Sequence, residues 1–170
     1  MSKTLVLLVH PNIAESRTNK RVAAALAQNP ACTVHDLYAA YPDFKIDVAH
    51  EQSLLAAHDK IVLQFPVYWY SSPALLKEWL DRVLTRGFAY AGGTALAGKQ
   101  LQVSCSVGSP EEVYSATGRN KYPLAHFFAP FELTAQLCGM TYLPHYAIHA
   151  AHRLTEEELG EKAAVFAATL

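Results

Sequence analysis

Two nearly continuous apolar segments place the strongest limit on the fold of this chain. They read TLVLLV at Thr4–Val9 and KIVLQF from residue 60 to residue 65. Strands of this kind are buried on both faces, which is typical of a parallel sheet covered by helices. Apolar runs of strand length alternate with segments of helical period, and this pattern predicts an α/β protein. The predicted strands are Thr4–Val9, Thr33–Leu37, Lys60–Gln64, Gln100–Ser106 and Thr141–Ile148.

Helices are predicted between and after these strands. The most clearly marked one begins with Ser72 as N-cap and Pro73 at the first helical position. It carries leucines, a valine and Trp79 on one stripe. A capping box of Thr155 and Glu158 starts the last helix. The other predicted helices are Arg17–Gln28, Asp47–His58 and, roughly, Pro123–Cys138.

Five strands and five helices predict a flavodoxin-like three-layer sandwich. Its sheet is parallel, with the strand order 2-1-3-4-5. A length of 170 residues suits one domain with a complete core, and no repeat or linker divides the chain. We therefore predict a single domain over residues 1–170.

Charge and cysteine content restrict the partners and the compartment. The net charge of −1 gives no attraction to nucleic acid. Cys32, Cys105 and Cys138 form no CxxC pair, which favours buried free thiols in a reducing compartment. The apolar run Leu5–Val9 is too short for the core of a signal peptide, and no run approaches the ~18 residues of a membrane span. We expect a cytoplasmic protein that reaches the inner face of a membrane only through a partner.

In the predicted sheet, the loops after strands one, three and four meet at one edge, where such folds bind ligands. The first loop, His10–Asn19, lacks GxGxxG and GxxxxGK[ST]. It instead places the residues SRTN, 16 to 19, at a helix N-terminus, where free N–H groups and the helix dipole favour a phosphate. Helix capping by Ser16 or Thr18 accounts for the same residues without a ligand.

The other two loops supply aromatic rings and a flexible backbone. The second loop, Pro66–Tyr70, ends in three consecutive aromatic residues, which suit contact with a flat ring system. These rings could also simply cover the core. In the third loop, Ser106–Tyr114, Gly108 permits a close approach of the backbone to a ligand.

Four segments carry a resemblance to a known family: VHPNIAESRTN, YPDFKID, FPVYWYSSPALLKEWLDRVLTRGFAY and GGTALAGK. They resemble the flavodoxin-fold NAD(P)H:quinone oxidoreductases, and in particular the ancillary flavoproteins of glutathione-gated Kef potassium-efflux antiporters. The resemblance covers nearly the whole chain. It implies non-covalently bound FMN, hydride transfer from NAD(P)H to a quinone or a related small-molecule acceptor, and a homodimer. For the ancillary flavoproteins it also implies binding to the cytoplasmic side of the antiporter.

The same resemblance assigns residues of each loop to the cofactor. The first loop would hold the ribityl phosphate, the second would line the isoalloxazine, and the third would contact its pyrimidine end. The implied residues are His10, Ser16, Arg17, Thr18 and Asn19, then Pro66, Val67, Tyr68, Trp69 and Tyr70, then Ser106, Val107, Gly108 and Ser109.

Two positions depart from the family pattern. Quinone reductases of the family pair a tyrosine with a histidine; Tyr114 matches the tyrosine, but Asn120 stands at the position of the histidine. An amide donates a hydrogen bond but cannot titrate. The usual Thr-Thr-Gly of the third loop is Ser106-Val107-Gly108 here, with one hydroxyl fewer. Both changes favour an alternative, a mainly regulatory flavoprotein with little turnover; a one-electron carrier is less consistent with the small net charge.

No metal site is predicted. His145, His149 and His152 have the spacing of ligands on one helix face, but they follow Pro144 in a predicted strand, where His145 and His149 share a face and His152 points away. The segment HEQ, residues 50 to 52, lacks the second histidine of HExxH.

Overall fold

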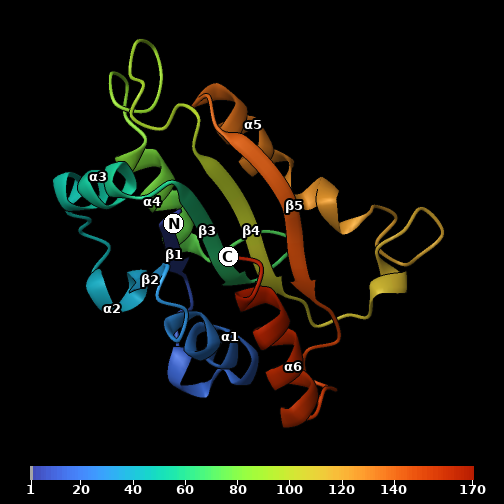
Figure 1. Cartoon of the computed structure of the whole chain (residues 1–170). Coiled ribbons are helices and arrows are strands. Elements are labelled where there is room, and N and C mark those ends of the chain that lie inside the picture. Colours follow the sequence, from blue (N-terminus) through green and yellow to red (C-terminus); the bar gives the residue numbers. More distant parts are fainter. Residues whose placement is uncertain (1) are drawn as a thin grey trace.

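A five-stranded parallel sheet forms the centre of the computed structural model, which describes residues 2–170 (Figure 1). The strand order is β2-β1-β3-β4-β5, and every neighbouring pair is parallel, which confirms the predicted topology. The strands are β1 Thr4–Leu8, β2 Cys32–Asp36, β3 Lys60–Pro66, β4 Gln100–Ser106 and β5 Thr141–Ile148.

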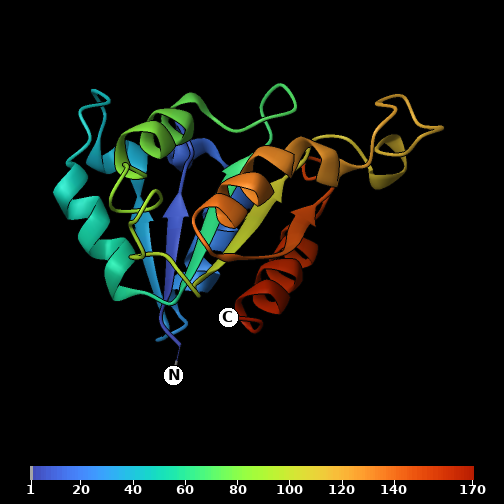
Figure 2. The same ribbon diagram turned by 90° about the horizontal axis from the view of Figure 1, so that it is seen from above.

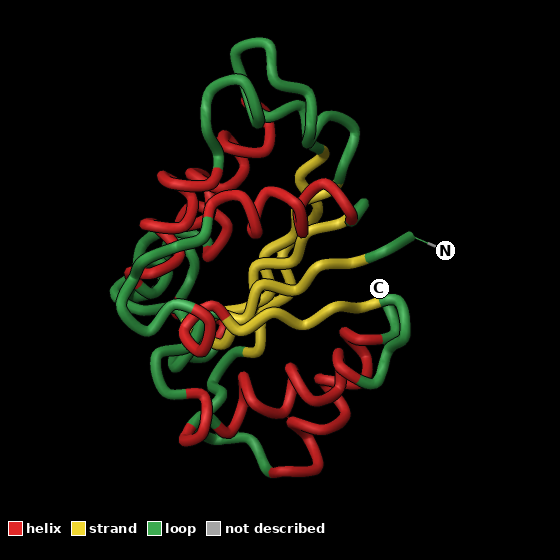
Figure 3. The backbone as a smooth tube through the Cα atoms, turned by 90° about the vertical axis from the view of Figure 1, so that its left-hand side faces the viewer, coloured by secondary structure: helices red, strands yellow, loops and turns green. Residues whose placement is uncertain are grey.

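Helices cover both faces of this sheet and make three layers (Figure 3). Helices α1 and α6 pack on each other and on one face, while α3, α4 and α5 contribute to the core on the other face. Every residue of β1 and β3 is buried, as the apolar runs predict. The helices are α1 Arg17–Ala27, α2 Leu37–Ala40, α3 Val48–Ala57, α4 Ala74–Val83, α5 Ala129–Leu137 and α6 Glu156–Ala167.

Two predicted helix starts hold in the structure, and one is wrong. Ser16 caps α1, and Thr155 with Glu158 forms the capping box of α6. Ser72, however, does not cap α4: Pro73 is the N-cap, with no side-chain hydrogen bond, and the helix begins one residue later. The extended backbone of Pro73 (φ −57°, ψ 149°) keeps it outside the helix.

The predicted helix Pro123–Cys138 is in fact two elements. A 3-10 helix, η3, covers Leu124–Phe128 and leads into α5. Pro130 lies in the first turn of α5 and has no N–H to donate to the preceding turn, so the α-helical ladder cannot continue across this position. The short helix α2 was also not predicted; it is too short to show a period, although Asp36 caps it by accepting the N–H of Ala39 (3.1 Å).

The sheet places three loops side by side. Since all strands run in the same direction, the loops after β1, β3 and β4 emerge at the same edge, toward which the arrows in Figure 2 point. The backbone reinforces this edge, because the N–H of Val67 donates to the carbonyl of Ser106 (2.9 Å). Within residues 2–170, no helix combines the length and apolarity that a membrane crossing requires.

Candidate functional site

A cleft of about 430 Å³ opens where these loops meet. All the residues assigned to a cofactor from the sequence line it, except Trp69, Tyr70 and Ser109. The fold thus brings together residues that are almost a hundred positions apart in the chain. The lining also includes three residues that sequence reasoning did not assign, namely Glu15, Ala151 and His152.

The N-terminus of α1 places backbone N–H donors at one end of the cleft. Ser16 accepts the N–H of Asn19 through its side chain (3.2 Å) and the N–H of Lys20 through its carbonyl (3.3 Å). The N–H groups of Arg17 and Thr18 precede the first intrahelical bond and have no carbonyl partner in the helix. Together with the helix dipole, these donors favour a phosphate-like group.

Arg17 adds a half-exposed positive charge to this end. Its guanidinium donates to Glu156 (2.7 Å) and to the carbonyl of Leu154 (3.1 Å). The two charged side chains are 50% and 69% exposed. An ion pair this exposed contributes less than about 1 kcal/mol, so Glu156 competes only weakly with an anion for Arg17.

A buried amide network underlies the cleft and joins the three loops. The side-chain amide of Asn19 donates to the hydroxyls of Ser106 (2.9 Å) and Ser16 (3.2 Å), while its oxygen accepts the amide of Gln64 (2.8 Å). These bonds fix the start of α1 against the ends of β3 and β4. Asn19 therefore acts in this structure as the internal link of the site.

Gln64 is a residue that sequence reasoning missed. It is buried in β3, and its side-chain oxygen has no donor among residues 2–170. A buried acceptor without a partner costs free energy unless a ligand or water supplies a donor. The available signal was a lone glutamine inside an apolar strand that ends at the predicted site.

His10 presents a neutral imidazole to the cleft. Burial lowers the pKa of His10, against the opposing effects of Asp36 and of the hydrogen bond with Asn12. The Nδ1 atom of His10 accepts the N–H of Asn12 (3.1 Å). The proton of the neutral ring must then lie on Nε2, which makes this atom a hydrogen-bond donor.

The aromatic segment forms a tight two-residue turn. Tyr68 and Ser71 exchange both backbone hydrogen bonds (3.0 Å each), and the central residues Trp69 and Tyr70 have φ values of 48° and 63°. Positive φ at both central positions is the mark of a type I′ turn, which normally takes Asn-Gly. The turn holds Trp69 out in solvent, 93% exposed, whereas only Tyr68 lines the cleft.

A second cavity, of about 280 Å³, lies beside this turn. Tyr70, Arg119, Asn120 and Phe127 line it. The ring centroid of Phe127 lies 5.3 Å from that of Tyr70 and 6.1 Å from that of Tyr114. Phe127 therefore packs between a residue of the second loop and a residue of the third.

Tyr114 has a histidine beside it that the sequence did not indicate. The ring of His149 is 5.7 Å from that of Tyr114, and its Nδ1 is buried without a hydrogen-bond partner among residues 2–170. Burial, above all, raises the pKa of Tyr114, so its hydroxyl stays protonated and can donate. Asn120 lines the second cavity instead, with its N–H bonded to the carbonyl of Val113 (3.1 Å).

His145, His149 and His152, the three closely spaced histidines, lie in different environments. His145 packs against Phe128, with ring centroids 5.2 Å apart, and His152 lines the cleft. Within residues 2–170 these three histidines do not come together as a metal-ligating group.

The sequence matches the family described as "Flavodoxin-like fold" over residues 2–170. It is 51% identical to the protein named "Uncharacterized NAD(P)H oxidoreductase YdeQ" of Bacillus subtilis, over 95% of this chain and 82% of that protein. It is 50% identical to the glutathione-regulated potassium-efflux system ancillary protein KefG of Cronobacter sakazakii, over 93% of this chain and 86% of KefG.

Two solved structures are similar in fold and in sequence. One is general stress protein 14 from Treponema denticola in complex with FMN, with a TM-score of 0.94, 43% identity, and coverage of 98% of this chain and 97% of the other. The second is an NADPH-quinone reductase from P. pentosaceus, with a TM-score of 0.90, 35% identity, and coverage of 98% and 96%.

Proposed function

Because this chain belongs to the flavodoxin-like fold family, we propose that it is an FMN-dependent NAD(P)H:quinone oxidoreductase. The observation that carries the proposal is the cleft itself, where an anion-binding helix end is tied by buried amides to the edge of β3 and β4. The similarity to an FMN complex and to an NADPH-quinone reductase supports the cofactor and the reaction class.

The residues of the cleft fit FMN. The first turn of α1, with Arg17 and the Nε2 donor of His10, matches the needs of a phosphate and a ribityl chain. At Gly108, a Cβ atom would have no protein atom within 4 Å, so the space beside this backbone is open. Tyr68, which also lines the cleft, offers an aromatic wall for the ring system.

Some backbone groups remain free for the edge of the ring, and others do not. The N–H of Val107 is used by the carbonyl of Ile148 (2.9 Å), and that of Val67 by Ser106. The N–H groups of Gly108 and Tyr70 have no acceptor among residues 2–170. These groups are the donors that would stabilise negative charge on the reduced cofactor.

Bound FMN would supply the two-electron carrier between NAD(P)H and the acceptor. The protein's part is to orient the reactants, exclude water and donate protons. The cavity beside Tyr70 and Phe127 has aromatic walls suited to a flat quinone. The protonated hydroxyl of Tyr114 would stabilise the developing oxyanion, with His149 beside it in place of the missing family histidine and Asn120 as a further donor.

The exposed rings near the cleft favour a homodimer. Trp69 and Tyr70, the central residues of the turn beside the cleft, are among the large side chains left exposed. A second copy that covered the turn would bury these rings and close the cofactor site, as the resemblance implies.

The similarity to KefG supports a second candidate function, a regulatory subunit of a Kef-type potassium-efflux antiporter. In this role the protein would be cytoplasmic and would meet the inner face of the membrane through the antiporter. Catalysis and regulation are compatible. Co-purification with the antiporter's cytoplasmic domain, together with loss of potassium efflux on deletion, would support the regulatory role.

The visible spectrum of the purified protein tests the enzymatic proposal. We expect flavin absorbance that NADPH bleaches under anaerobic conditions and that a simple quinone restores. Protein reconstituted with FMN that keeps its absorbance in excess NADPH and excess NADH would contradict the proposal. Rapid bleaching without restoration by any quinone would instead favour the regulatory candidate.

The strained turn gives a separate prediction. We expect the double replacement Trp69→Asn with Tyr70→Gly to raise the free energy of unfolding of the apoprotein by about 1–2 kcal/mol. The reason is that Asn and Gly tolerate the positive φ of these two positions better than Trp and Tyr do. In the proposed homodimer these two rings would help to close the cofactor site, so their loss should lower the affinity for FMN roughly 10-fold. Chemical denaturation and flavin fluorescence titration measure the two effects. The matched control, Tyr122→Asn, removes an exposed ring outside the turn and should leave the FMN affinity unchanged; an unchanged affinity in the double variant would show that the turn does not serve the flavin.

A further inference from the structure

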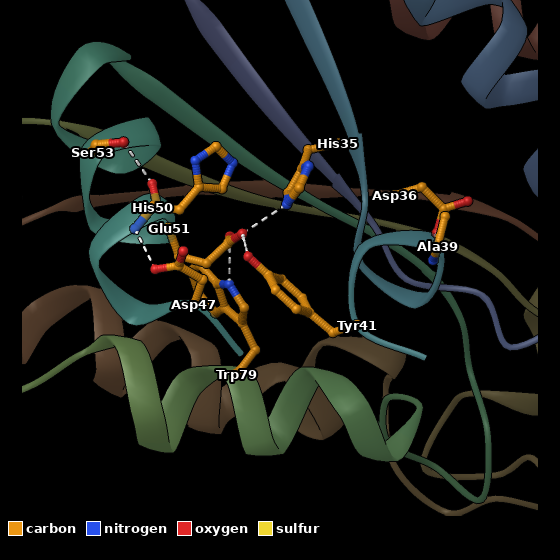
Figure 4. Close-up of polar contacts among 9 residues, drawn as sticks. All are labelled: His35, Asp36, Ala39, Tyr41, Asp47, His50, Glu51, Ser53 and Trp79. Atoms are coloured by element: carbon orange, nitrogen blue, oxygen red, sulfur yellow. Dashed lines mark hydrogen bonds and ion pairs between the residues drawn. The ribbon is translucent and has the colours of Figure 1, made fainter. Parts of the chain in front are cut away.

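A second polar cluster lies away from the cleft, between the edge strand β2 and helix α3 (Figure 4). His35 comes from β2, and His50 and Glu51 come from the first turns of α3. One ligand atom from each of these three side chains can be chosen so that all lie within 4.8 Å of one another. The sequence motif HEQ lacked a second histidine, and the fold supplies one from another element.

The carboxylate of Glu51 is held in place by two donors that are not part of this triad. Its side chain is fully buried, and it accepts the hydroxyl of Tyr41 (2.6 Å) and the indole N–H of Trp79 (2.8 Å). Hydrogen bonds of this kind, made to a carboxylate by residues that do not themselves touch the metal, orient the carboxylate and tune its affinity for the metal. His35 completes the set, with its Nε2 atom 2.7 Å from the carboxylate (Figure 4).

We propose that His35, His50 and Glu51 form a binding site for a divalent transition metal ion, with Zn²⁺ as the natural probe. Two imidazoles and one carboxylate are ligands that Zn²⁺ accepts, and water would complete a four-coordinate site. The ion would take the place of the hydrogen bond between His35 and Glu51, with the imidazole proton moving to Nδ1. The proposal departs from the expectation, drawn from the sequence, that the chain has no metal site.

The exposure of the three ligands gives the ion a way in and suits a reversible site. Glu51 is buried, His35 is partly buried, and His50 is exposed on the surface of α3. The buried pair alone could serve as an ordinary hydrogen bond in the core. His50 distinguishes a metal site from such a hydrogen bond, because its imidazole makes no hydrogen bond within residues 2–170 and is therefore free to bind an ion. Its ring lies edge to face with that of His35, with ring centroids 5.9 Å apart.

The location also predicts what a bound ion would connect. Glu51 bonds to Trp79 of α4, the helix that follows the aromatic turn, while His35 belongs to the strand at the edge of the sheet. An ion shared by β2 and α3 would therefore resist local opening at this edge. It would act on stability and not on the hydride chemistry, so the site is independent of the proposed function.

Isothermal titration of Zn²⁺ into the FMN-loaded, tag-free protein tests the site. We expect one equivalent of Zn²⁺ to bind. The variant His50→Ala should bind at least about 100-fold more weakly, because loss of a ligand should cost no less than loss of a residue that only supports a ligand, which costs up to about 100-fold. Tyr41→Phe, which removes a donor to Glu51, should weaken it by roughly 10-fold. Zn²⁺ should raise the melting temperature of the wild type but not of His50→Ala.

The matched control is His126→Ala, which removes another exposed histidine outside the triad. Its zinc affinity should equal that of the wild type. His50→Ala changes only an exposed side chain, so it is expected to fold, and circular dichroism would verify this. The absence of stoichiometric binding to the wild type, or equal binding by the wild type and His50→Ala, would overturn the proposal.

Discussion

Replacing Glu51 with glutamine is expected to lower the free energy of unfolding of this protein by about 3 kcal/mol. The carboxylate accepts three hydrogen bonds, from His35, Tyr41 and Trp79, and has no exposure to solvent. A glutamine of the same shape turns an N–H group toward donors and leaves at least one of them without an acceptor. Breaking a buried charged network in this way costs about 3–5 kcal/mol when a partner is removed outright.

The same carboxylate predicts how stability depends on pH. Burial alone would raise the pKa of Glu51, but the hydrogen bonds from His35, Tyr41 and Trp79 outweigh it and lower the pKa. A lowered pKa in the folded state means that the stabilisation is present above the unfolded-state pKa of about 4.3 and is lost as the pH falls through the folded-state value. The difference in stability between wild type and Glu51→Gln should therefore shrink below pH 4.

Urea denaturation of the apoprotein in the presence of EDTA measures this effect without a contribution from FMN or a metal. Glu78→Gln is the matched control, because it makes the same chemical change on the surface of α4, where Glu78 pairs with Arg82. That exposed pair should contribute less than about 1 kcal/mol. Equal losses in the two variants would contradict the role assigned to the buried network.

Replacing Asn19 with aspartate is expected to weaken FMN binding by roughly 100-fold while leaving the apoprotein folded. The side chain is buried at the first turn of α1, directly beside the donors that we assign to the phosphate. Two like unit charges about 6 Å apart repel by about 3 kcal/mol at an effective dielectric constant of about 20, which corresponds to roughly 100-fold in Kd.

The free protein should tolerate this aspartate. A carboxylate can still accept the amide of Gln64, and the hydroxyls of Ser16 and Ser106 can rotate to donate to it. A negative charge in the first turn of a helix is also favoured by the helix dipole. The variant thus separates loss of the cofactor from loss of the fold.

Fluorescence titration with FMN and thermal denaturation of the apoprotein measure the two quantities. Asn29→Asp is the control, since it introduces the same charge just beyond the opposite end of α1, about 15 Å away along the helix. Its FMN affinity should match that of the wild type, although it loses the bond from Asn29 to the carbonyl of Ala167. Unchanged FMN affinity in Asn19→Asp would refute the assignment of the phosphate to this helix end.

The layers of the fold and the edge at which the site forms follow from the amino-acid sequence alone. The apolar runs of β1 and β3 require burial on both faces, and the alternation of strands and helices then leaves few topologies. Local signals at Ser16 and Thr155 marked helix starts correctly, because capping involves residues only three positions apart. The local signals failed at two prolines: Pro73 stands just before α4 and not inside it, and Pro130 lies at the start of α5, after a separate 3-10 helix.

The contacts between side chains of different elements, in contrast, depend on the three-dimensional packing. Tyr114 and His149 become neighbours through β5, Asn19 meets Gln64 and Ser106 beneath the cleft, and Glu51 joins His35 to Trp79. The structure also turned Trp69 into solvent, although the aromatic run itself suggested a wall along a ring. This difference arises because the periodicity of a sequence indicates which residues are buried, but not which residues they contact. Neighbouring strands of a parallel sheet are joined by crossover connections of about a dozen residues or more, so residues that meet across the sheet lie far apart in the sequence.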